Sequence, residues 1–144
     1  MSRPRPTYRT FVIERHLAVP RDDAWQALLE LLEGAGHERT GTPPPHGVGA
    51  RIRFTLDSTE MVEETLSFEP PWRRVYEMVE GAPVALYQGT TAIRDDGPEC
   101  HLVWSYLVDP GDLAEPEFDA FLDRVQTALH RAVDRVAQRL AAAR

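Results

Sequence analysis

A carboxylate stands among apolar residues in a stretch that has the alternation of a β-strand. Glu64 shares its side of that alternation with Val62 and Leu66, so we expect its side chain to point into the protein. A buried carboxylate needs a charged partner or a raised pKa, and Glu64 could therefore act as an internal acid or base. The alternative is a structural carboxylate paired with Arg53 or Arg74, or a glutamate at the rim of a sheet. Both interpretations stay open at this point.

Histidine is the other residue type suited to proton transfer near neutral pH. Five histidines occur, and His37 and His46 lie close together in a proline-rich segment. The histidine spacings do not match a zinc motif, and the sequence contains no nucleophile elbow, Cys–His arrangement or glycine-rich phosphate loop. The sequence therefore predicts no metal site and no cofactor, and it identifies no catalytic residue.

A sheet must position these groups, because much of the chain alternates with a period of two. Turn-forming residues such as Pro70-Pro71 and Asp95-Asp96-Gly97 separate the alternating stretches. Short turns between consecutive strands favour antiparallel pairing. Three consecutive prolines predict a loop over residues 37–49. We expect strands over residues 7–19, 50–56, 61–68, 72–80, 85–94 and 99–108.

Two segments have helical periodicity instead. Trp25, Leu28 and Leu32 predict a short helix after the first strand. Apolar residues recur every three or four positions from Phe118 to Leu140, which predicts a long amphipathic helix at the C-terminus. A sheet with one apolar face needs a cover, and this helix is the one predicted element large enough. The fold class is therefore α+β.

Composition narrows the class of protein. The length of 144 residues suits one domain, expected over residues 8–144 behind a flexible tail at 1–7. A formal charge of -7 with scattered arginines argues against nucleic acid as a partner. A single cysteine, Cys100, excludes an intrachain disulfide. We see neither a signal peptide nor a membrane span, so we expect a cytoplasmic monomer or homodimer.

Three stretches resemble the START-like (SRPBCC) superfamily, and its polyketide cyclase/dehydrase-type branch in particular. They are FVIERHLAVPRDDAWQALLE, EETLSFEPPWRRVYEMVEG and YQGTTAIRDDGPECHLVWSYLVDP, and the resemblance covers residues 8–140. The branch is also similar to activator-of-Hsp90-ATPase-like proteins. The resemblance implies a helix-grip fold: a curved antiparallel sheet of about six strands around the C-terminal helix, with one or two short helices after the first strand.

The resemblance also implies a hydrophobic cavity between the sheet and the long helix. We expect inward-facing sheet residues and the apolar stripe of the helix to line it, with His37 and His46 in the loop over its mouth. Each candidate could equally be ordinary core packing. The candidate ligand-binding residues are Phe54, Glu64, Tyr76, Met78, Tyr87, Trp104, Tyr106, Phe118, Phe121, Leu122 and Val125.

Three functions are compatible with such a domain. The first is the binding of a small hydrophobic or aromatic molecule in the cavity. The second is a cyclase or dehydratase acting on a polyketide-like or aromatic substrate, which needs an acid and a base that converge in the cavity. The third is a protein-interaction module without a ligand, and the polar residues expected on the outer face of the sheet argue against it.

Overall fold

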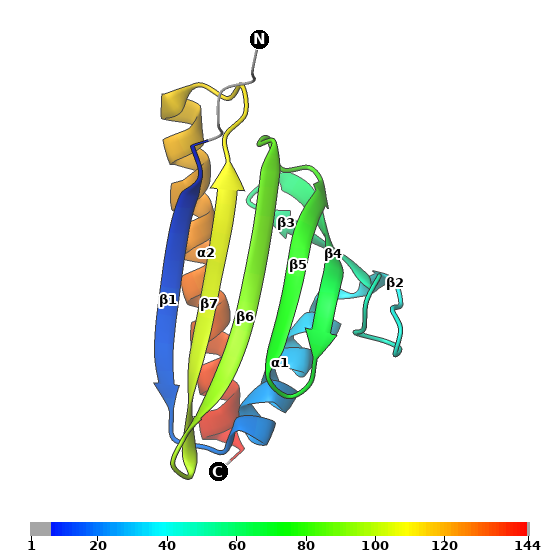
Figure 1. Ribbon diagram of the computed structural model, residues 1–144, viewed down its shortest axis with the longest axis vertical. Helices are drawn as coiled ribbons and strands as arrows, with labels where there is room; N and C mark the ends of the chain where they lie inside the picture. Colours follow the sequence, from blue (N-terminus) through cyan, green and yellow to red (C-terminus); the bar gives the residue numbers. More distant parts are fainter. Residues whose placement is uncertain (1–6, 144) are drawn as a thin grey trace.

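The computed structural model describes residues 7–143 as one sheet and two helices (Figure 1). Seven antiparallel strands follow the order β1-β7-β6-β5-β4-β3-β2, and both helices lie behind the sheet in the view of Figure 1. The elements are β1 (Arg9–Leu17), α1 (Arg21–Ala35), β2 (His37–Arg39), β3 (Arg51–Leu56), β4 (Thr59–Glu69), β5 (Arg73–Glu80), β6 (Leu86–Asp96), β7 (Glu99–Asp109) and α2 (Glu115–Ala142).

The long helix α2 covers the sheet with one face. Its buried residues recur at spacings of three and four from Phe118 to Val136, while positions such as Asp119 and Arg131 stay exposed. This is the stripe that the sequence predicts, and its burial against the inner face of the sheet removes both apolar surfaces from water. The same face of α2 also borders the cavity described below.

The shorter helix α1 closes one end of the same face. Asp22 and Asp23 lie in its first turn, where carboxylates suit the positive end of the helix dipole. Gly36 ends it with a φ of 85°, a conformation that glycine adopts with little strain. Trp25 and Leu28 are buried, and α1 packs against α2, β3, β6 and β7.

The predicted helix-grip fold is confirmed, with one strand more than expected. The extra strand, β2, occupies the start of the segment predicted as a loop and pairs with β3. Further along that segment, Thr42 and Val48 form an isolated bridge. Three residues are too few for an alternation to be visible in the sequence. The predicted tail over 1–7 lies outside the described residues apart from Thr7.

Candidate functional site

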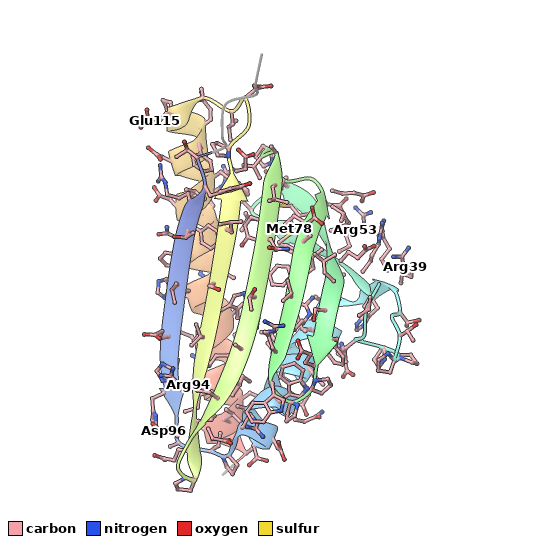
Figure 2. The ribbon with its side chains drawn as sticks, in the orientation of Figure 1. Arg39, Arg53, Met78, Arg94, Asp96 and Glu115 are labelled. Atoms are coloured by element: carbon pink, nitrogen blue, oxygen red, sulfur yellow. The ribbon has the colours of Figure 1, made fainter. Side chains whose placement is uncertain are left out.

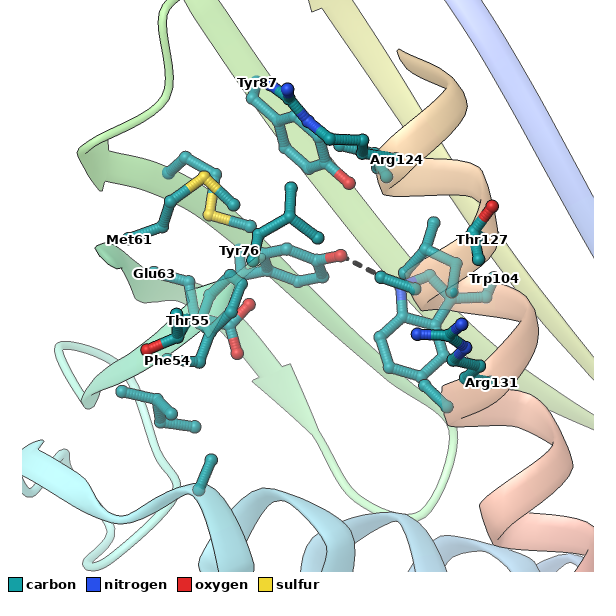
Figure 3. A pocket seen from close by; sticks show the side chains of 18 of the residues that line it. Phe54, Thr55, Met61, Glu63, Tyr76, Tyr87, Trp104, Arg124, Thr127 and Arg131 are labelled. Atoms are coloured by element: carbon teal, nitrogen blue, oxygen red, sulfur yellow. Dashed lines mark hydrogen bonds between the residues drawn. The ribbon is translucent and has the colours of Figure 1, made fainter. Parts of the chain in front are cut away.

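A cavity of about 520 Å³ lies between α2 and the inner face of the sheet (Figure 3). Apolar side chains such as Ile52, Leu56 and Leu129 form much of its wall, and the last turns of α1 close one end. Exposed lining residues, among them Asp57 and Arg124, mark its mouth between α2 and the β3–β4 turn. The site is thus a half-open apolar pocket under the long helix.

Sequence reasoning placed eleven residues on this wall, and the structure brings only part of that set together. Tyr106, Phe118, Phe121 and Leu122 are buried but lie beside the cavity, in the contact between the first turns of α2 and the sheet. There Tyr106 stacks on Tyr87 with ring centroids 5.4 Å apart, and Phe121 meets Tyr87 edge-on. The predicted residues that do line the cavity are Phe54, Tyr76, Met78, Tyr87, Trp104 and Val125.

The prediction that Glu64 points inward is wrong. Its Oε1 accepts hydrogen bonds from Arg39 Nη2 at 2.7 Å and from Arg51 Nε at 2.8 Å, away from the cavity. Glu64 is instead a structural carboxylate paired with arginines, although its partners are not the expected Arg53 and Arg74. The cause is an irregularity in β4 between Thr65 and Ser67, where β4 has one residue more than β5 between consecutive pairs. Such a shift breaks the strict alternation of sides.

Glu63 lies on the cavity wall instead. It is buried, and its Oε1 accepts a hydrogen bond from Arg74 Nη2 at 3.0 Å. Arg74 is itself only 1% exposed, so the two charges neutralise each other inside the protein. Because Glu63 and Glu64 are consecutive in the strand, the alternation of the sequence does not show which of the two faces inward. The other shift of this strand pair, between Val62 and Glu63, lies in β5, and neither shift could be predicted from the sequence.

Tyr76 and Trp104 form the polar centre of the sheet wall. Trp104 Nε1 donates to the Tyr76 hydroxyl at 2.9 Å, the dashed line in Figure 3. The Tyr76 ring crosses Gly89 on β6, where an added Cβ would lie 2.1 Å from Cζ of Tyr76. Burial raises the pKa of Tyr76 and of Tyr87, and the charge of Glu63 adds to both shifts. Both phenols are therefore neutral near physiological pH.

The helix wall combines alanines with larger apolar residues and is flanked by charges. Ala128 and Ala132 line the cavity from α2, where larger side chains would fill it. Arg124 reaches Asp57 of the β3–β4 turn with Nε and Oδ2 3.7 Å apart, an ion pair across the mouth. Figure 3 shows Arg124 beside Tyr87 and Arg131 beside Trp104. The cavity therefore combines apolar walls with a charged rim.

Comparison with known proteins agrees with this geometry. The family described as "Polyketide cyclase / dehydrase and lipid transport" matches residues 9–143. The chain belongs to that family. The match confirms the predicted relation to the START-like superfamily. None of the curated proteins matches the sequence significantly.

Several solved structures have a fold similar to that of this chain but low sequence identity to it. Norcoclaurine synthase from Thalictrum flavum, in complex with dopamine and hydroxybenzaldehyde, is 20% identical with a TM-score of 0.71, over 96% of this chain and 90% of that one. Ara h 8.0201 is 12% identical with a TM-score of 0.72, over 94% and 99%. A protein from Thermus thermophilus is 16% identical with a TM-score of 0.67, over 94% and 99%. These likenesses show the fold.

Two histidines of this family member form a separate cluster. His37 Nε2 and His46 Nδ1 lie 3.2 Å apart, and His46 Nε2 is 3.3 Å from Glu33 Oε1. Neither histidine lines the cavity, and their place over its mouth stays a prediction. His46 is 6% exposed, and burial lowers its pKa, although the hydrogen bond to Glu33 opposes this.

The described residues, 7–143, offer neither a metal site nor a membrane-spanning helix. In that range, no group of three His, Cys, Asp or Glu side chains is placed to hold a metal ion. Neither α1 nor α2 is long and apolar enough to cross a membrane. The cytoplasmic location, the oligomeric state and the absence of a nucleic-acid partner stay predictions.

Proposed function

We propose that the protein binds a small hydrophobic or aromatic molecule in the cavity between α2 and the sheet. The observation that carries the proposal is the cavity itself: about 520 Å³ of space in a domain whose sheet and helices are otherwise closely packed. Burial of apolar ligand surface would drive binding, at about 25 cal/mol per Å² before ordering costs. The residues proposed to contact the ligand include Phe54, Met78 and Trp104.

The dimensions and chemistry of the site support a small aromatic ligand. Ligand pockets typically measure about 300–1,000 Å³ and combine apolar walls with a few fixed polar groups. Here the polar groups are the Glu63 carboxylate and the Tyr76 hydroxyl, both held by neighbours. The structural relative norcoclaurine synthase was solved with dopamine and hydroxybenzaldehyde, which are aromatic molecules of suitable size.

A second candidate function is catalysis of the cyclase or dehydratase type. Glu63 and Tyr76 lie on the same cavity wall, and the negative charge of Glu63 is felt by Tyr76. A carboxylate beside neutral phenols provides a base and hydrogen-bond donors, the pair that such chemistry requires. In this reading Glu63 would accept a proton from the bound substrate, and the tyrosines would stabilise developing charge on its oxygen.

The test of ligand binding is a fluorescence titration with N-phenyl-1-naphthylamine, a neutral aromatic dye that brightens in apolar surroundings. We expect saturable binding to the wild type. The double variant Ala128→Leu/Ala132→Leu fills the cavity from α2 and should abolish binding while the protein stays folded. The matched control, Ala120→Leu/Ala141→Leu, places leucines at exposed positions of the same helix and should bind like the wild type.

Either of two results would contradict the proposal. The wild type could fail to bind the dye, or the cavity-filled variant could bind it as tightly as the control. For the catalytic candidate, Glu63→Gln keeps a similar shape but removes the base. Turnover of a ligand found with the protein would then be lost while its binding persists.

A further inference from the structure

The arginines of this protein fall into two groups. Most of those in residues 7–143 form ion pairs with nearby carboxylates, for example Arg15 with Asp134 and Arg139 with Glu30. Because the chain is acidic, with a formal charge of -7, partners for arginine are plentiful. The arginines of the described range that have neither an ion pair nor a hydrogen bond are Arg94, Arg131 and Arg135.

Two of these three line the cavity. Arg131 and Arg135 lie four residues apart on α2, one turn from each other on the same face. The same end of the cavity is bordered by Leu31 and Ala35 of α1. Acidic residues near this end offer no neutralisation, since Asp134 is engaged by Arg15 and Glu30 by Arg139. Two uncompensated positive charges therefore stand at this end of the rim.

The other end of the rim is charged differently. There Arg124 pairs with Asp57, and Asp123 also lines the cavity. An anion would meet two carboxylates at that end and two free guanidinium groups at the α1 end. Like charges four residues apart on a helix repel each other, so an anion held between Arg131 and Arg135 would remove that repulsion. Guanidinium groups also match the planar oxygens of a carboxylate.

We propose that the ligand is amphipathic and anionic: an aromatic or aliphatic body fills the cavity, and a carboxylate or similar oxyanion is held by Arg131 and Arg135. This inference rests on the proposed function, because it concerns the same cavity. It also gives the ligand an orientation. The anionic group lies at the α1 end beside Arg131 and Trp104, and the apolar end points toward Tyr87 (Figure 3).

The experiment compares two dyes that share one aromatic frame. N-phenyl-1-naphthylamine is neutral, and 8-anilinonaphthalene-1-sulfonate carries an added sulfonate. Both are titrated into the wild type, into Arg131→Gln/Arg135→Gln and into the control Arg94→Gln. Arg94 is exposed, is likewise unpaired, and lies near the β6–β7 turn (Figure 2). Circular dichroism confirms that each variant is folded.

We expect the double variant to bind the sulfonate dye about tenfold or more weakly than the wild type, as the loss of charge-assisted hydrogen bonds implies. Its affinity for the neutral dye should be unchanged, and Arg94→Gln should alter neither affinity. Added salt should weaken the sulfonate dye alone. If the double variant binds both dyes like the wild type, or loses both equally, the anion site is refuted while the cavity stands. If the wild type binds neither dye, the proposed function itself fails.

Discussion

The contact between α2 and the sheet has two parts with opposite character. Near the start of α2, Phe118, Phe121 and Leu122 fill the space up to Tyr87 and Tyr106, and the packing is solid. One or two turns later the helix presents Ala128 and Ala132 to the sheet, and a cavity of about 520 Å³ opens. The same helix face thus packs as core in its first turns and borders a pocket in the turns that follow.

The difference shows that an inward direction is not sufficient to make a residue part of a site. Tyr106 and Trp104 both face inward from β7, yet only Trp104 borders the cavity. What separates them is the packing of α2 against the sheet. Gln126 of α2 donates to the Tyr106 hydroxyl, whereas the turns that carry Ala128 and Ala132 leave a gap. Size on the helix, more than polarity on the sheet, decides where a ligand could fit.

The largest expected effect comes from deleting a side chain in the solid part. Phe121→Ala should lower the free energy of unfolding by about 3–5 kcal/mol, because it removes a buried ring and leaves a void. Met78→Ala, on the cavity wall, should cost about 1 kcal/mol, since Met78 already borders empty space. Urea denaturation measures both. Equal losses at the two positions would abolish the distinction between core and pocket.

Breaking the buried ion pair between Glu63 and Arg74 should cost a similar or slightly smaller amount of unfolding free energy. Glu63→Leu should destabilise the fold by about 3–5 kcal/mol, because Arg74 would remain buried without its partner. Adding Arg74→Met to that variant should restore most of the stability, since no buried charge is then left unpaired. Thermal or urea unfolding of the single and double variants tests this. A double variant no more stable than Glu63→Leu would contradict the account of this wall.

Much of the fold could be predicted from the sequence, because the alternation in β6 and β7 and the stripe of α2 are regular. The candidate site could be predicted only in part. Phe54, Tyr76 and Met78 follow unbroken alternation and were placed correctly on the inner face, whereas their contact with a ligand stays a prediction. Glu64 was misplaced because a shift in β4 reverses the sides there.

Other features were missed for different reasons. Arg74 was considered only as a partner for Glu64, and its pairing with Glu63 depends on the same shift in β4. Gly89 offered a usable signal, since a glycine inside a strand often marks a close approach, here by the ring of Tyr76. Whether Arg131 and Arg135 have ion-pair partners depends on the positions of all nearby carboxylates in the folded protein. The residue pattern of one helix does not contain that information.

The smallest expected effect lies outside both parts, at the histidine cluster. Burial lowers the pKa of His46 below its ordinary value of 6.5 in the folded state. As the pH falls through that value, the unfolded chain takes up a proton that the folded protein does not, so stability is lost below it. His46→Gln should therefore show a shallower fall in unfolding free energy between pH about 7 and about 5. An identical pH dependence in the two proteins would contradict the assignment.

The most direct test of ligand binding in the cavity uses the methionine methyl groups. Two of the three methionines in the sequence, Met61 and Met78, line the cavity. We would label methionine methyl groups with ¹³C, assign them with Met61→Leu and Met78→Leu, and follow their NMR signals while N-phenyl-1-naphthylamine is added. A ligand under α2 should shift both signals in the wild type and neither in Ala128→Leu/Ala132→Leu. Saturable dye binding that leaves both wild-type signals unmoved would place the ligand elsewhere and contradict the central claim.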